Sequence, residues 1–135
     1  MTVKQYLSQA YTATQKIVDI REQVVRLREE MTRLGRSISE DTRVQVTRQR
    51  DPMGDRVADI LDKIDEREKL LARLEDVIFT VETALNRIEC VTSYRVLHAH
   101  YVRGLKMREI AQELNYSNSY VYALHREGLE KIGEF

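Results

Sequence analysis

The sequence predicts an all-α fold in which a long, coiled-coil-like antiparallel helical hairpin precedes a module of three short helices. Two rows of apolar residues that recur at steps of three and four positions predict the two long helices. Near residue 91 the pattern changes to short apolar clusters separated by glycine or asparagine, which predicts short helices. We therefore expect two parts, a hairpin at residues 1–90 and a compact module at residues 91–135.

The first apolar row predicts a helix that begins near the N-terminus. Steps of three and four residues place its ten members on one helix face, with no polar interruption. Gly35 follows the last member, and we expect the helix to end there because glycine adopts positive φ without steric cost. The row consists of Val3, Tyr6, Ala10, Ala13, Ile17, Ile20, Val24, Leu27, Met31 and Leu34.

A second row of the same kind predicts a second helix that continues to about residue 90. Arg67 is its only polar member. At about 1.5 Å per residue each helix would span roughly 50 Å, so an antiparallel hairpin could align the two rows. The row consists of Val57, Ile60, Ile64, Arg67, Leu71, Leu74, Ile78, Val81, Leu85 and Ile88.

A further apolar stripe lies beside the second row, at Leu70, Val77 and Ala84. It widens the apolar face beyond the needs of two helices, so something should cover it. The candidates are the C-terminal module, a partner protein or a second copy of the chain. We favour the second copy, and hence a homodimer or a higher homo-oligomer formed through the hairpin.

Residues 35–56 are polar, contain Pro52 and Gly54, and predict a long loop between the helices. The alternation at 44–47 is typical of a strand, but no other strand signal offers it a ladder partner. A loose excursion is therefore the favoured interpretation of this loop.

The charge distribution restricts where nucleic acid could bind. The chain has 22 basic and 22 acidic residues. Residues 57–90 hold nine acids and five bases, a net charge of −4 that would repel nucleic acid, whereas residues 91–135 hold six bases and five acids, a net charge of +1. A DNA-facing surface must therefore lie in the C-terminal module.

Several classes of protein are excluded as interpretations. No run of 18 apolar residues and no secretory signal are present, so we expect a cytoplasmic protein without a membrane partner. The single cysteine, Cys90, fits a reducing compartment and is expected to be a small buried hydrophobe. His98, His100 and His125 lack zinc-ligand spacing, and no phosphate loop or nucleophile elbow occurs, so we expect no metal, no cofactor and no enzyme activity.

The C-terminal module fits a 20-residue helix-turn-helix frame that begins at Met107. Ala111 is small where the two helices must cross, and Asn115 occupies the turn because asparagine tolerates positive φ. Ser117 can cap the second, recognition helix. The interior positions of the frame hold Ile110, Ala111, Leu114, Tyr116, Val121 and Leu124.

A further set of motifs in the C-terminal module consists of Tyr94-Arg95-Val96-Leu97, Tyr101-Val102-Arg103-Gly104-Leu105, Glu109-Ile110-Ala111, Leu114-Asn115-Tyr116-Ser117, Val121 and Leu124-His125-Arg126. With these motifs, about the last 42 residues resemble region 4 of sigma-70-type transcription factors. The whole arrangement is similar to small phage and prophage proteins of Gram-positive bacteria described as sigma region 4-like transcriptional regulators. The resemblance implies binding of double-stranded DNA and control of transcription in a bacterial host cell, with RNA polymerase as a further candidate partner.

Two departures from the region 4 pattern concern the first helix of the frame. Lys106 stands where serine or threonine usually caps, and a lysine side chain cannot cap. Arg108 stands where an acid is common, although both bases could face a DNA phosphate. No equivalent of sigma region 2 is visible in the sequence, so we do not expect a complete sigma factor.

The outward face of the recognition helix supplies the candidates for reading bases. Arg126 could bind guanine and Asn118 could pair with adenine. Tyr120 lies with Ser117 at the N-terminal end of the helix. The base-reading candidates are Ser117, Asn118, Ser119, Tyr122, Ala123 and Arg126, and the phosphate candidates are Arg103, Lys106 and Arg108.

Three functions fit these patterns. The favoured interpretation is a sequence-specific transcriptional regulator. A phage DNA-packaging protein, like the small subunit of a terminase, also joins a helix-turn-helix to oligomerising helices and would form a larger assembly with weak sequence preference. The third is a protein-interaction module that contacts RNA polymerase, for which Arg126 would be dispensable.

Overall fold

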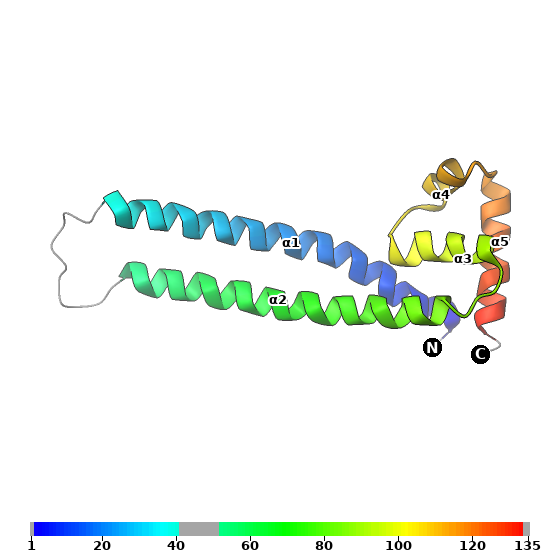
Figure 1. The fold of residues 1–135 in the computed structure, drawn as a ribbon, viewed down its shortest axis with the longest axis horizontal. Helices are drawn as coiled ribbons and strands as arrows, with labels where there is room; N and C mark the ends of the chain where they lie inside the picture. The colour runs from blue at the N-terminus through cyan, green and yellow to red at the C-terminus, as the bar shows by residue number, and fades with distance from the viewer. Residues whose placement is uncertain (1, 41–51, 134–135) are drawn as a thin grey trace. The chain divides into compact units, whose positions relative to one another are not determined.

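The computed structural model describes residues 2–40 and 52–133, which form helices joined by short connections (Figure 1). No strand occurs in these two ranges, and the all-α prediction is confirmed. A five-residue π-helix, η1, continues α3 directly. The elements are α1 (Val3–Glu40), α2 (Pro52–Leu85), α3 (Val91–Leu97), η1 (His98–Val102), α4 (Met107–Leu114) and α5 (Asn118–Ile132).

The ends of the long helices differ from the sequence-based expectations. α1 continues through Gly35 to Glu40 and α2 already begins at Pro52, so the prediction of a helix end at Gly35 and of a loop over 35–56 is wrong at both borders. Gly35 lacks positive φ, and glycine inside a helix costs only about 1 kcal/mol relative to alanine. Proline suits a first helical turn, where no N–H partner is needed. The segment 44–47 lies outside the described residues.

α2 ends at Leu85, five residues before the expected end. Asn86 and Arg87 form a turn, and the N–H of Ile88 donates to the carbonyl of Leu85 at 3.0 Å. Ile88 is nonetheless buried, with 7% of its surface exposed. The apolar row therefore predicted correctly that Ile88 is buried, but wrongly that it belongs to the helix.

The chain divides into two compact units. The distal unit is residues 18–72, and the basal unit combines residues 1–17 with residues 73–135. The division passes through α1 and α2, so each long helix contributes to both units. The expected functional parts, residues 1–90 for association and residues 91–135 for DNA binding, remain a proposal about function.

The distal unit is held by the two predicted apolar rows. Its buried core consists of Val24, Leu34, Ile60 and Ile64, with Leu27, Met31, Met53 and Val57 packed around them. Every one of these eight side chains belongs to one of the rows except that of Met53. Apolar burial at about 25 cal/mol per Å² is the main term that holds such a helix pair together.

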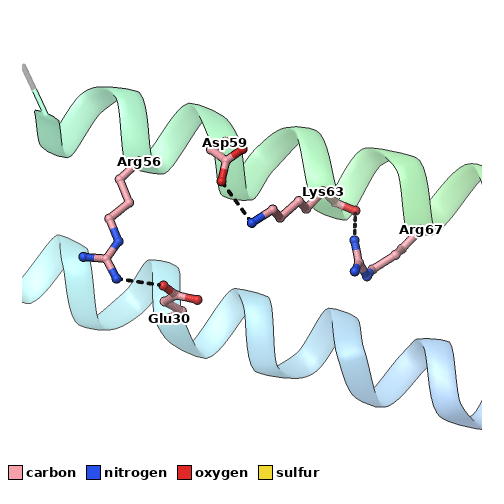
Figure 2. A network of polar contacts seen from close by, with 5 residues as sticks. All are labelled: Glu30, Arg56, Asp59, Lys63 and Arg67. Carbon is pink, nitrogen blue, oxygen red and sulfur yellow. Dashed lines mark hydrogen bonds and ion pairs between the residues drawn. The ribbon is translucent and has the colours of Figure 1, made fainter.

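Polar contacts fix the register of the distal unit. The half-buried Arg67 donates from Nε to Oε1 of Gln23 at 2.9 Å and from Nη1 to the carbonyl of Lys63 at 3.1 Å. Exposed ion pairs flank it, between Arg56 and Glu30 at 3.3 Å and between Lys63 and Asp59 at 3.0 Å (Figure 2). Exposed pairs contribute about 0–1 kcal/mol each, whereas one polar residue within an apolar seam selects a single register.

The basal unit places the start of α1 inside the core of the C-terminal module. Leu7 and Ala10 are completely buried in a cluster with side chains from α2, α3, η1 and α5. Burial of Leu7 was not predicted, because the first apolar row passes through its neighbour Tyr6 instead. The cluster consists of Leu7, Ala10, Val81, Leu85, Ile88, Leu97, Tyr101 and Ile132.

A second cluster in the basal unit holds the helix-turn-helix together. Ala111 is 4% exposed where α4 meets α5, as its small size predicted. Leu114 and Tyr116 are half-buried against this cluster, so all six interior positions of the predicted frame face it. Its buried members are Val96, Ala99, Ile110, Ala111, Val121 and Leu124.

We expect Leu7→Ala to lower the free energy of unfolding by about 2–5 kcal/mol, since it removes a fully buried side chain. Val18→Ala is the matched control on the same helix, because Val18 is 62% exposed and its truncation should cost no more than about 0.5 kcal/mol. Urea denaturation followed by circular dichroism measures both. Equal, small losses in the two variants would show that the start of α1 does not belong to the core.

Candidate nucleic-acid interface

The turn between α4 and α5 has the geometry that the helix-turn-helix frame requires. Asn115 adopts the left-handed conformation, with φ 59° and ψ 41°. The N–H of Tyr116 donates to the carbonyl of Ala111 at 2.9 Å, which closes the end of α4. Asparagine visits this region more easily than other residues with a Cβ, because its short amide can bond locally. The sequence-based assignment of the turn is confirmed.

Ser117 caps α5 as expected. Its Oγ accepts a hydrogen bond from the N–H of Tyr120 at 3.2 Å. The cap satisfies one of the free amides in the first turn of α5, which stabilises a helix by about 1 kcal/mol. The recognition helix therefore begins at a defined residue, and Asn118 and Ser119 lie in its first turn.

α4 begins without a side-chain cap at Lys106, as its chemistry requires. Glu109 takes over part of this role, because its Oε1 accepts from the N–H of Lys106 at 3.4 Å. A carboxylate in the first helical turn also complements the helix dipole. The departure from the region 4 pattern at Lys106 is thus offset within the same turn.

The outer face of α5 is open to solvent. Ser117, Asn118, Ser119, Tyr122 and Arg126 are exposed, and Ala123 is half-buried. The two tyrosines in this region, Tyr120 and Tyr122, are 46% and 53% exposed. The structure therefore brings all six base-reading candidates together on one helix and its cap.

An open groove connects α4 with the start of α5. Its volume is about 610 Å³, and it is lined by Arg108, Ala111, Gln112, Asn115, Tyr116, Ser117 and Asn118.

 The groove brings the phosphate candidate Arg108 close to the cap of the recognition helix. Sequence reasoning missed Gln112, which is exposed one turn after Arg108 and could have been found from that spacing.

The three phosphate candidates are not gathered at one place. Arg103 donates from Nη1 to both carboxylate oxygens of Glu113, at 3.1 and 3.2 Å. It lines a different hollow of about 270 Å³, which Tyr94, Arg95 and His98 share. This pair was not predicted, because its members lie ten residues apart and outside a common helix.

A buried polar pair connects α5 to η1. The Tyr101 hydroxyl lies 2.7 Å from Nε2 of His125, next in sequence to the base-reading candidate Arg126. Burial, together with the charges of His100 and Lys4, lowers the pKa of His125 from 6.5 to about 4. Burial also raises the pKa of Tyr101 to about 12. Both groups are therefore neutral at pH 7, and the hydroxyl can donate to the unprotonated Nε2.

α1 contacts His100 and Val102, the neighbours of Tyr101 in η1. Its Tyr11 ring stacks on His100 with ring centroids 5.0 Å apart. Thr14 donates from Oγ1 to the carbonyl of Val102 at 2.9 Å. Gly104 has a φ of +75°, and a Cβ there would lie 2.9 Å from Nε2 of Gln15. The positive φ thus favours glycine after η1.

Cys90 precedes α3 and is half-buried instead of fully buried, so the expectation of a buried hydrophobe is wrong in degree. Its Sγ lies 3.3 Å from the Thr92 hydroxyl. That hydrogen bond, helped by Ser93, lowers the pKa of the thiol from 9.0 to about 7. The position at the start of a helix explains the difference, since one side of the residue faces solvent.

The chain is similar to one family across nearly its whole length. A sequence model described as "ECF sigma factor" matches residues 2–129. The match includes the long helices as well as the helix-turn-helix, so it is longer than the resemblance in the last 42 residues. Searches of the curated proteins and of the solved structures found no significant match. In the ranges that the structure describes, no helix is long and apolar enough to cross a membrane.

We expect Asn115→Val to lower the free energy of unfolding by about 1–2 kcal/mol, because a β-branched residue is strained at positive φ. Asn115→Gly is the matched control, since glycine adopts this conformation without that strain. Thermal denaturation of both variants measures the difference. If valine were tolerated as well as glycine, the left-handed turn would be contradicted.

We expect the wild-type protein to lose stability more steeply than His125→Gln as the pH falls from about 6.5 to 4. In that window the imidazole binds a proton in the unfolded chain but not in the folded protein, so stability rises with pH. Above pH 6.5 this contribution is fully present. Urea denaturation at pH 7 and pH 5 measures it, and parallel losses in the two proteins would refute the role of His125.

Proposed function

The chain belongs to the ECF sigma factor family, and on this premise we propose that it regulates transcription by binding double-stranded DNA sequence-specifically through α4 and α5. The observation that carries the proposal is the solvent-exposed outer face of α5 behind a rigid left-handed turn. A recognition helix must project from its module to enter a major groove, and its outward side chains then meet the base edges.

The base-reading roles follow from side-chain chemistry. Arg126 has a planar guanidinium that can bind O6 and N7 of guanine together. Asn118, in the first turn of α5, can pair with N6 and N7 of adenine. Ser117, Ser119, Tyr122 and Ala123 complete the proposed reading surface. The Tyr101–His125 hydrogen bond supports this assignment, because it holds α5 at the residue next to Arg126.

The three basic residues proposed to bind phosphate differ in their roles. Arg108 and Lys106 are exposed on α4 and its N-cap, and Arg108 lines the groove beside Ser117. In a helix-turn-helix the first helix crosses the DNA backbone, which is where these side chains would bind phosphate. Arg103 would first have to leave Glu113, so we assign it a weaker role.

We further propose that the protein acts as a homodimer or a higher homo-oligomer formed through the hairpin. The net charge is zero and the C-terminal module is only weakly basic, so one copy would neutralise few phosphates. Two copies could place their recognition helices about 34 Å apart, or a multiple of it, on one face of the duplex. RNA polymerase is a candidate partner on the basis of the family.

The proposed setting is the cytoplasm of a bacterial host, as a phage or prophage regulator and not a complete sigma factor. The support is the resemblance to small phage proteins that join a helical N-terminal half to a region 4-like module. The family itself is regulatory, which supports a function in binding and not in catalysis.

We expect selection from a random pool of DNA duplexes to enrich a short motif with the wild-type protein. Arg126→Ala should lose about 1–3 kcal/mol of discrimination at one base pair, because a bidentate contact to guanine is removed. Arg95→Ala is the matched control, since Arg95 is an exposed arginine on α3 outside the groove beside Ser117. Sequencing of the bound pool measures both effects.

Enrichment that is unchanged in Arg126→Ala would contradict the assignment of that residue. No enrichment at all would contradict sequence-specific binding. In that case a large ring-shaped assembly would favour a packaging function, and a small assembly that binds RNA polymerase would favour the protein-interaction function.

A further inference from the structure

An open groove runs between α1 and α2 on one side of the distal unit. It has a volume of about 710 Å³ and is not a closed ligand cavity. Most of its lining side chains are charged, and two of them, Arg67 and Gln23, are hydrogen-bonded to each other. The groove is lined by Gln23, Arg26, Leu27, Glu29, Glu30, Arg33 and Arg67.

The α1 wall of the groove carries charges in the order plus, minus, plus. These are Arg26, Glu29 and Arg33, which are all exposed. Arg26 and Arg33 form no ion pair with any residue in the described ranges. They are seven residues apart, so they lie on the same side of the helix about 10 Å from each other.

The facing wall is the side of α2 that holds Arg67, the one α2 residue that lines the groove. On this side Asp59, Lys63 and Glu66 follow one another at steps of four and three residues, with charges minus, plus and minus. Figure 2 shows Asp59 and Lys63 joined by their ion pair. Asp59 and Lys63 are 61% and 50% exposed. Glu66, seven residues after Asp59, lies on the same side of α2 and is also exposed.

The two walls match in both sign and spacing. From Arg26 the α1 charges step by three and then four residues to Arg33. From Glu66 the α2 charges step back by three and then four residues to Asp59. Antiparallel helices with this spacing can bring three opposite pairs together: Arg26 with Glu66, Glu29 with Lys63 and Arg33 with Asp59.

We propose that a second copy of this chain docks on this face of the distal unit, with α1 of each copy against α2 of the other. A two-fold axis parallel to the hairpin keeps the antiparallel direction and stays within about one turn of the register that Gln23 and Arg67 set. Each of the three charge pairs then forms twice. The inference sharpens the association proposed above, and it does not depend on DNA binding.

Apolar side chains support the same occupant. Leu70, one turn after Arg67, is 36% exposed, and the half-buried Leu27 lines the groove. A second copy would cover both of these side chains. Nucleic acid is a poorer occupant, because Asp59 and Glu66 on the α2 wall would repel its phosphates.

The test uses two charge-reversed variants of the full chain. The α1-reversed variant is Arg26→Glu with Arg33→Glu, and the α2-reversed variant is Asp59→Arg with Glu66→Arg. In a homodimer of either variant like charges would face each other, so we expect the dimer dissociation constant to rise at least about tenfold. An equimolar mixture should restore a heterodimer, because both of its interfaces regain opposite charges. Sedimentation equilibrium without DNA measures all three samples.

Asp65→Arg with Asp76→Arg is the matched control. It makes the same change in charge as the α2-reversed variant, but on another face of α2. We expect it to dimerise like the wild type, and circular dichroism checks that every variant folds. The proposal is overturned if the wild type is monomeric, if the mixture does not restore association, or if the control weakens the dimer equally.

DNA binding is measured separately, with the wild type and with the α1-reversed variant, so failure of one experiment leaves the other interpretable. A monomeric wild type whose DNA affinity falls in the α1-reversed variant would make the groove a nucleic-acid contact and would also overturn the proposal. A dimer with the expected charge dependence but without DNA binding would retain this inference and contradict the proposed function.

Discussion

Leu7 and Ala10 are completely buried among side chains from α2, α3, η1 and α5, and the basal unit depends on this burial. The C-terminal module alone is short, and small domains bury too little apolar surface to be very stable. The first turns of α1 enlarge its core. They also hold the end of η1 through Thr14 and the ring of His100 through Tyr11. The helix-turn-helix therefore rests on a segment from the other end of the chain.

Within this frame, a few local features set the position of the recognition helix. Asn115 reverses the chain at a left-handed residue, and Ser117 fixes the start of α5. Tyr101 and His125 form the buried polar contact behind the helix. A buried hydrogen bond specifies orientation more strictly than apolar packing, because leaving either partner unsatisfied costs about 1–3 kcal/mol. The outward side chains of α5 are thus held on a rigid base.

Local patterns predicted the elements and much of the candidate site. The apolar rows, the turn at Asn115, the cap at Ser117 and the interior position of Ala111 all depend on neighbours within a few residues. Errors arose where contacts distant in sequence decide. Leu7 is buried by the C-terminal module, and Arg103 pairs with Glu113 on another element. Gly35 shows a different limit, since a glycine permits a helix end without requiring one.

The core of the basal unit joins the start of α1 to the end of α5, and this affects how the protein folds. Leu7 and Ile132 belong to the same cluster, so the cluster can close only after synthesis has passed Ile132. Contacts between distant residues slow folding because a long loop must close first. In the distal unit α1 packs against α2, so early formation of this unit would shorten that loop. Early pairing of α1 with α2 would thus bring the first residues of α1 closer to α5 and ease closure of the basal core.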